Sequence, residues 1–134
     1  MGMIRSGFTA LGALAIAASA WAQHQPDPAQ VAAGQEKAQI CAACHGPEGK
    51  GNGPAAAALK KAPADLTELS SHNNGKFPDV RVSRYIEGVD TVQAHGTRDM
   101  PVWGDVFKSL NRDPAASTMR VSNLTEYVKS LQAK

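Results

Sequence analysis

Two cysteines and a histidine stand within five consecutive residues, at Cys41, Cys44 and His45, and the sequence contains no other cysteine. On one turn of helix, two thiols three residues apart reach two vinyl groups on one edge of a porphyrin, and the adjacent imidazole reaches the iron. Each thiol then forms a thioether, and the histidine becomes the proximal iron ligand. The spacing therefore predicts the covalent attachment site of one c-type haem.

Two other chemistries use the same residue types. A disulfide or a thioredoxin-like dithiol would use Cys41 and Cys44 with His45 as a neighbour, but a thioredoxin-like site opens a helix after a buried strand. Residues 31–40 contain no β-branched run of that kind. A tetrahedral zinc site would need a fourth ligand from another histidine, and none stands at a zinc-finger spacing. The other histidines are His24, His72 and His95.

A six-coordinate haem iron needs a second axial ligand, and Met100 is favoured for this role. Pro101 would stiffen the backbone beside the sulfur, and Trp103 could form a wall of the pocket. His95 would instead give a bis-histidine haem of lower potential. Met119 lies on or beside the expected last helix, where packing is the ordinary role of a thioether. We therefore predict His45 and Met100 as the iron ligands, with His95, another residue or an open site as the alternatives.

The beginning of the chain has the features of a secretory signal peptide. Arg5 precedes an apolar run over 8–18, and Ala-Trp-Ala at 20–22 is a small-x-small cleavage site. The apolar run is well short of the ~20 residues that span a bilayer. We expect removal of residues 1–22 and export to the periplasm of one compact domain, 23–134, without stable membrane insertion.

The charge balance does not favour a nucleic acid or a strongly acidic protein as a partner. Removal of the leader takes away one arginine, which leaves 13 lysines and arginines against 12 acidic residues. Two haem propionates would bring this balance close to neutral, so it gives no argument for nucleic-acid binding. The whole chain has only two Trp, two Tyr and three Phe with which to build a core. A buried porphyrin would supply the missing apolar bulk, and we expect the chain without haem to be poorly folded.

We expect the elements that position these residues to be helices joined by loops. Asp27 followed by Pro28 is a typical helix start, and this helix is expected to run to about Cys44. Glycines and prolines over 46–54 predict a loop directly behind His45. Farther along, we expect a short helix over 55–61, a turn over 70–76, a helix over 78–87, a long loop over 88–103 and a last helix over about 118–132. No segment shows the alternation of a strand.

Together these features resemble a bacterial class I cytochrome c, over residues 32–131. The resemblance rests on Ala33-Gly34 ahead of the Cys-Ala-Ala-Cys-His-Gly motif, the loop ending at Gly53-Pro54, the Pro63–Thr67 segment, Met100–Phe107 and the final helix with Tyr127. It implies a small all-α fold of about four helices wrapped around one covalently bound haem c. Cys41, Cys44, His45 and Met100 would then hold the haem.

The resemblance also implies two contacts. The first and last helices are expected to cross near Gly34 and Tyr127. The carbonyl of Pro54 is expected to accept a hydrogen bond from the His45 imidazole, which would fix the ring and raise its basicity. The chain departs from the family pattern in lacking a lysine-rich face, so docking through a ring of lysines is not expected.

In function, the resemblance implies an electron-transfer protein and not an enzyme. Its partners would be an electron donor, such as a dehydrogenase or a quinol-oxidising complex, and an acceptor, such as a terminal reductase or oxidase. The segments 63–67 and 100–107 are also similar to those of enzyme-associated cytochrome domains. The alternative is therefore a dedicated cytochrome c subunit of a larger periplasmic dehydrogenase or oxidase complex. A third class, an enzyme or gas sensor, would have an open iron site.

Overall fold

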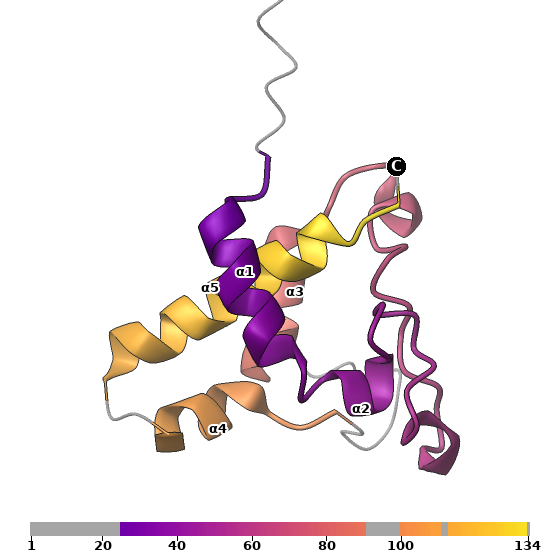
Figure 1. The fold of residues 1–134 in the computed structure, drawn as a ribbon, viewed down its shortest axis with the longest axis horizontal. Coiled ribbons are helices and arrows are strands. Elements are labelled where there is room, and N and C mark those ends of the chain that lie inside the picture. Colours follow the sequence, from indigo (N-terminus) through magenta and orange to yellow (C-terminus); the bar gives the residue numbers. More distant parts are fainter. Residues whose placement is uncertain (1–24, 91–99, 111–112, 134) are drawn as a thin grey trace, which may run out of the picture.

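The computed structural model describes residues 25–90, 100–110 and 113–133, so the expected signal peptide lies outside the described residues. Within these ranges the chain has five α-helices, two short 3₁₀ helices and no strand (Figure 1). The elements are α1 Pro28–Ala38, α2 Ala42–His45, η1 Ala56–Ala58, η2 Ser71–Asn73, α3 Asp79–Glu87, α4 Trp103–Leu110 and α5 Pro114–Ser130. The described part of the fold is all-α, as predicted. None of its helices is long and apolar enough to cross a bilayer.

Two of these helices begin with the same capping device. Before α1, the side chain of Asp27 accepts a hydrogen bond from the amide of Ala29 at 2.8 Å. Before α5, the side chain of Asp113 accepts one from the amide of Ala115 at 2.9 Å. In both helices a proline follows the aspartate, where its missing N–H costs no hydrogen bond. The start of α1 is therefore confirmed, whereas the start of α5 lies four residues before the predicted Thr118.

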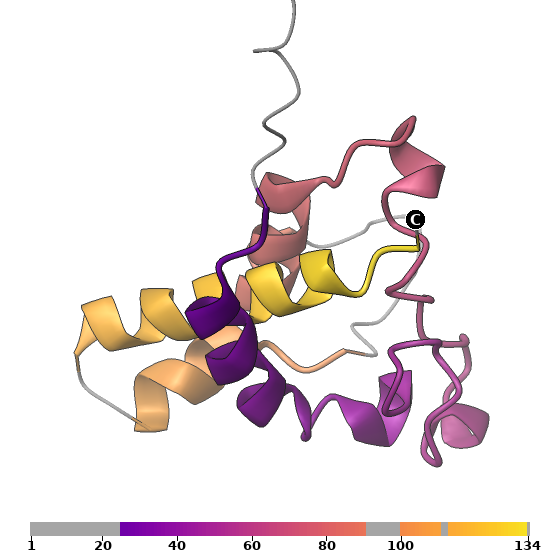
Figure 2. The same ribbon diagram turned by 45° about the horizontal axis from the view of Figure 1, so that its top comes forward.

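The first and last helices cross in contact with each other (Figures 1 and 2). Gly34 of α1 is buried at the crossing. A Cβ atom placed on it would lie 2.8 Å from Cβ of Tyr127 and closer still to the carbonyl oxygen of Asn123. Only glycine allows this approach, which confirms the predicted crossing at Gly34 and Tyr127.

The apolar core lies where α3 and α4 pack against α5. It consists of Ile86, Phe107, Val121 and Leu124, each less than a tenth exposed. Trp103 packs against this cluster, and its ring centroid lies 6.2 Å from that of Phe107. The helix predicted over 78–87 is confirmed by α3, which ends at a left-handed Gly88 with φ of 77°.

The structure departs from the prediction in three further elements. The first helix ends at Ala38 instead of about Cys44, because the chain tightens into i→i+3 hydrogen bonds, from the Cys41 amide to Ala38 at 2.9 Å and from the Ala42 amide to Gln39 at 3.3 Å. The short helix expected over 55–61 is reduced to η1, because Leu59 is extended. Helix α4 has no counterpart among the predicted elements.

Candidate functional site

Helix α2 brings the three motif residues together. Cys41 is its N-cap residue, and Cys44 and His45 lie within the single turn that it forms. All three are half-buried, and both cysteines are free thiols. Burial raises the pKa of the Cys41 thiol, and the neighbouring Cys44 adds to this shift. At neutral pH the Cys41 sulfur is therefore protonated.

The glycine-rich loop behind α2 holds this helix in place. A helix of four residues leaves all its carbonyls without intrahelical partners, so it has little stability of its own. Here four amides from the following chain meet these carbonyls one by one. The pairs are Gly46 to Ala42 at 2.9 Å, Ala55 to Ala43 at 2.8 Å, Gly53 to Cys44 at 3.0 Å and Gly51 to His45 at 2.8 Å. The predicted loop over 46–54 thus wraps around α2.

A second segment, residues 62–67, passes close to this loop. The amide of Leu66 donates to the carbonyl of Gly49 at 2.7 Å. Gly51 has a φ of 75°, and a Cβ atom there would lie 3.3 Å from the carbonyl oxygen of Ala64 and would overlap that of Pro63. Glycine at position 51 is therefore required both by its backbone angle and by this approach.

The approach places the Ala64 carbonyl oxygen 3.0 Å from Nδ1 of His45. Because a carbonyl only accepts, this contact requires the proton on Nδ1 and leaves the lone pair of a neutral imidazole on Nε2. The expectation that Pro54 supplies this acceptor is wrong. The chain around Pro54 instead runs along α2, where the next amide, that of Ala55, pairs with Ala43.

Met100 lies on a different segment from the other three residues. It directly follows the undescribed residues 91–99, which include the alternative ligand His95, and 37% of its surface is exposed. In both views the segment 100–102, drawn in orange before α4, runs toward α2 (Figures 1 and 2). Trp103 packs against the core with Phe107. The structure thus gathers Cys41, Cys44 and His45 and leaves Met100 on a neighbouring segment.

The donor set fits a haem in its chemistry. In the described ranges, no group of three or more His, Cys, Asp and Glu side chains is arranged to hold a metal ion. A porphyrin brings four nitrogen ligands of its own, so the protein needs to supply only axial ligands and points of attachment. His45 offers a free Nε2, and Cys41 and Cys44 offer two thiols beside it.

Sequence reasoning missed two residues near this site. Ala64 acts through its main-chain carbonyl, which no residue type reveals. Gln132, beyond the end of α5, bonds to the backbone of the segment that follows Ala64. A glutamine close to the end of a chain carries no signal for such a role.

No protein-family model, curated protein or solved structure matches the chain.

Proposed function

We propose that this chain is an exported monohaem c-type cytochrome that carries single electrons between redox partners. The observation that supports this most directly is the state of His45. Its Nδ1 is engaged by the Ala64 carbonyl, so Nε2 is available, and two free thiols lie on the same turn. When bound, the haem supplies an iron that alternates between the ferric and ferrous states.

Each site residue has a separate role in this proposal. Cys41 and Cys44 would anchor the macrocycle, and His45 would hold the iron through Nε2. The Ala64 carbonyl orients the imidazole and makes it a stronger donor. Met100 would hold the iron as its second protein ligand, and a thioether in that role would raise the reduction potential. With His45 and Met100 both holding the iron, no position would be left for a substrate, and the protein would act as a carrier and not as an enzyme.

The proposed partners are an electron donor and an electron acceptor in the periplasm, such as a dehydrogenase and a terminal oxidase. Contacts of this type are small and weak, which permits rapid exchange of partners. The alternative is a dedicated subunit of such a complex. Purification distinguishes the two, because a subunit would be recovered with a stoichiometric catalytic partner and a free carrier would be recovered alone.

The test is expression of the full chain with its leader in a host that attaches c-type haem, followed by a pyridine haemochrome spectrum and a redox titration. We expect one covalently attached haem per chain that cycles reversibly. The Cys41→Ser/Cys44→Ser double variant is the control and should lack covalent haem. A purified chain without covalent haem, or with a haem that cannot be cycled, would overturn the proposal.

A further inference from the structure

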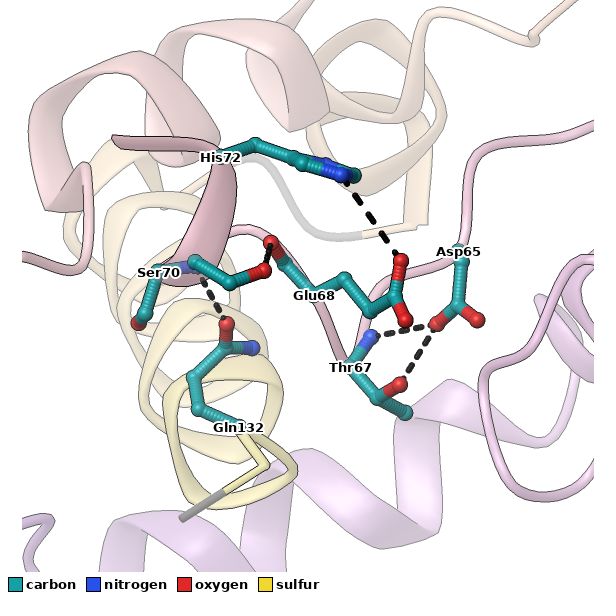
Figure 3. Close-up of polar contacts among 7 residues, drawn as sticks. Asp65, Thr67, Glu68, Ser70, His72 and Gln132 are labelled. Carbon is teal, nitrogen blue, oxygen red and sulfur yellow. Dashed lines mark hydrogen bonds and ion pairs between the residues drawn. The ribbon is translucent and has the colours of Figure 1, made fainter. Parts of the chain in front are cut away.

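Hydrogen bonds join the end of the chain to the segment that follows Ala64, as Figures 1 and 3 show. Gln132 makes three hydrogen bonds through its side chain. Its Oε1 accepts from the amide of Ser70 at 2.8 Å, and its Nε2 donates to the carbonyls of Leu66 at 2.6 Å and of Val128 at 2.8 Å. A single amide group therefore connects the last turn of α5 to two points on a segment more than 60 residues away in sequence.

The backbone continues this attachment. The amide of Ala133 donates to the carbonyl of Thr67 at 3.0 Å, between the two points that Gln132 holds. The three contacts together fix residues 66–70 against the end of α5. The Gln132 bonds are half-buried, so loss of the side chain would leave backbone groups of Leu66 and Ser70 without their partners.

Residues 66–70 are connected to His45 through Leu66 and Ala64. Leu66 is held on one side by Gln132 through its carbonyl and on the other by Gly49 through its amide, at 2.7 Å. Ala64, two residues earlier, presents its carbonyl to His45 Nδ1. Between them, Asp65 Oδ1 accepts from the Thr67 amide at 2.8 Å and hydroxyl at 2.6 Å, which stiffens the turn (Figure 3). The position of the carbonyl thus depends on how firmly Leu66 is held.

We propose that Gln132 is a positioning residue for His45. By holding Leu66 and Ser70, it keeps the Ala64 carbonyl on Nδ1 and so fixes both the ring orientation and the proton position of the imidazole. The proposal depends on the proposed function only where Nε2 is assigned to iron. The link from Gln132 to Nδ1 is a property of the chain itself.

The variants separate the two ends of the Gln132 amide. Gln132→Leu removes all three hydrogen bonds. Gln132→Glu keeps the acceptor for the Ser70 amide but loses the donor to Leu66. The matched control is Gln30→Leu, because Gln30 also bridges two elements, with Oε1 accepting from the Ser122 hydroxyl at 3.4 Å, but it has no contact with residues 62–70 among the described hydrogen bonds.

The first readout is exchange of the His45 Nδ1 proton with water, measured by ¹⁵N-histidine NMR on the purified, reduced protein. We expect both Gln132 variants to exchange about tenfold faster than the wild type, the factor that corresponds to one hydrogen bond. The midpoint potential should rise in both, because a less firmly bonded imidazole is a weaker donor to ferric iron. Gln30→Leu should match the wild type in both readouts.

Unchanged exchange and potential in folded Gln132→Leu would overturn the inference, as would an equal effect of Gln30→Leu. If Gln132→Leu does not fold, native-state exchange of the wild type decides. The Leu66 amide, the Ala133 amide and the His45 Nδ1 proton should then open with one common free energy, and independent opening would overturn the link. Haem content is measured separately by the pyridine haemochrome spectrum, so a chain without covalent haem contradicts the proposed function, whereas unchanged Nδ1 exchange in haem-loaded Gln132→Leu contradicts only the link from Gln132 to His45.

Discussion

The four proposed haem-binding side chains divide into a group of three on one turn and one residue on another segment. Cys41, Cys44 and His45 share the turn of α2, which the loop amides hold from behind. Met100 precedes α4 on a segment outside the loop 46–54. Attachment and the second axial ligand should therefore respond separately to substitution.

Met100→Ala tests this separation. We expect covalent haem to remain, the second axial position to open and the potential to fall, because the thioether ligand is lost. Absorption spectra and redox titration measure both effects. The matched control is Met119→Ala in α5, where 63% of the side chain is exposed and no change is expected. If Met100→Ala keeps the wild-type spectrum and potential, the ligand assignment is wrong and His95 becomes the leading candidate.

Asp65 should make the protein sensitive to acid. Hydrogen bonds from the Thr67 hydroxyl and amide hold the pKa of Asp65 below its ordinary value of 3.8, and the charges of Lys50 and His72 act in the same direction. The stability gained from this carboxylate is complete above pH 3.8 and is lost as the pH falls through the lower pKa of the folded state.

Urea unfolding of Asp65→Asn at neutral and acidic pH measures this contribution. The variant should be less stable than the wild type at pH 7, and the difference should shrink at a pH below 3.8. Asp105→Asn is the control, because its exposed contact with Lys108 spans 3.7 Å and contributes little. A difference for Asp65→Asn that stays constant with pH would contradict the argument.

The crossing of helices α1 and α5 depends on the absence of a side chain at Gly34. Gly34→Ala places a Cβ atom against the carbonyl of Asn123, which is backbone and cannot turn away. We expect a loss of about 1–3 kcal/mol in the free energy of unfolding despite the better helix propensity of alanine. Ala32→Ser, on an exposed position of the same helix, is the control. Equal stability of Gly34→Ala and the wild type would show that the helices can separate without cost.

Helix starts were predictable where capping is local. The Asp-Pro pair identifies the start of α1, and the same pair at Asp113 identifies that of α5 once it is sought. The end of α1 at Ala38 was not predictable, because it depends on how the loop draws α2 away from the helix axis. Helix α4 was missed although Trp103 and Phe107 stand at helical spacing, because only tertiary packing makes so short an apolar stripe a helix.

The candidate site shows the same division. Residue types and spacing identify Cys41, Cys44 and His45, because their chemistry lies in their side chains. The partner of His45 Nδ1 is a main-chain oxygen on a segment 19 residues away, and only the fold selects which carbonyl arrives there. The resemblance to the cytochrome family predicted Pro54 as this acceptor, which lies on a different loop segment from Ala64.

The apolar core and the candidate site occupy different regions of the molecule. The core lies among α3, α4 and α5. The candidate site lies on α2, and the chain that follows it, from 46 to 76, consists mainly of loops (Figures 1 and 2). Across 42–76, all of which the structure describes, no apolar side chain is less than a tenth exposed, and Phe77, directly after this region, is the first that is. A bound apolar group should therefore add most to the stability of the loop region.

The Cys41→Ser/Cys44→Ser double variant tests whether bound haem stabilises the loop region. Without covalent haem, we expect a broader urea transition and a loss of about 3 kcal/mol or more, as for removal of a tightly held ligand. Hydrogen exchange should increase more over 46–76 than over α5. Circular dichroism and exchange measurements on the wild type give the reference. A double variant with the wild-type midpoint and cooperativity would contradict the prediction.

The hydrogen bond between His45 and Ala64 has an evolutionary consequence. Ala64 is exposed and contributes only its carbonyl, so substitutions of its side chain leave the acceptor in place and should accumulate by drift. Gly51 touches no reactive atom, yet any side chain there would overlap the carbonyl oxygen of Pro63, the residue before Ala64. Purifying selection should therefore act on Gly51, and descendants of this chain should keep the glycine while the residue that orients the histidine varies freely.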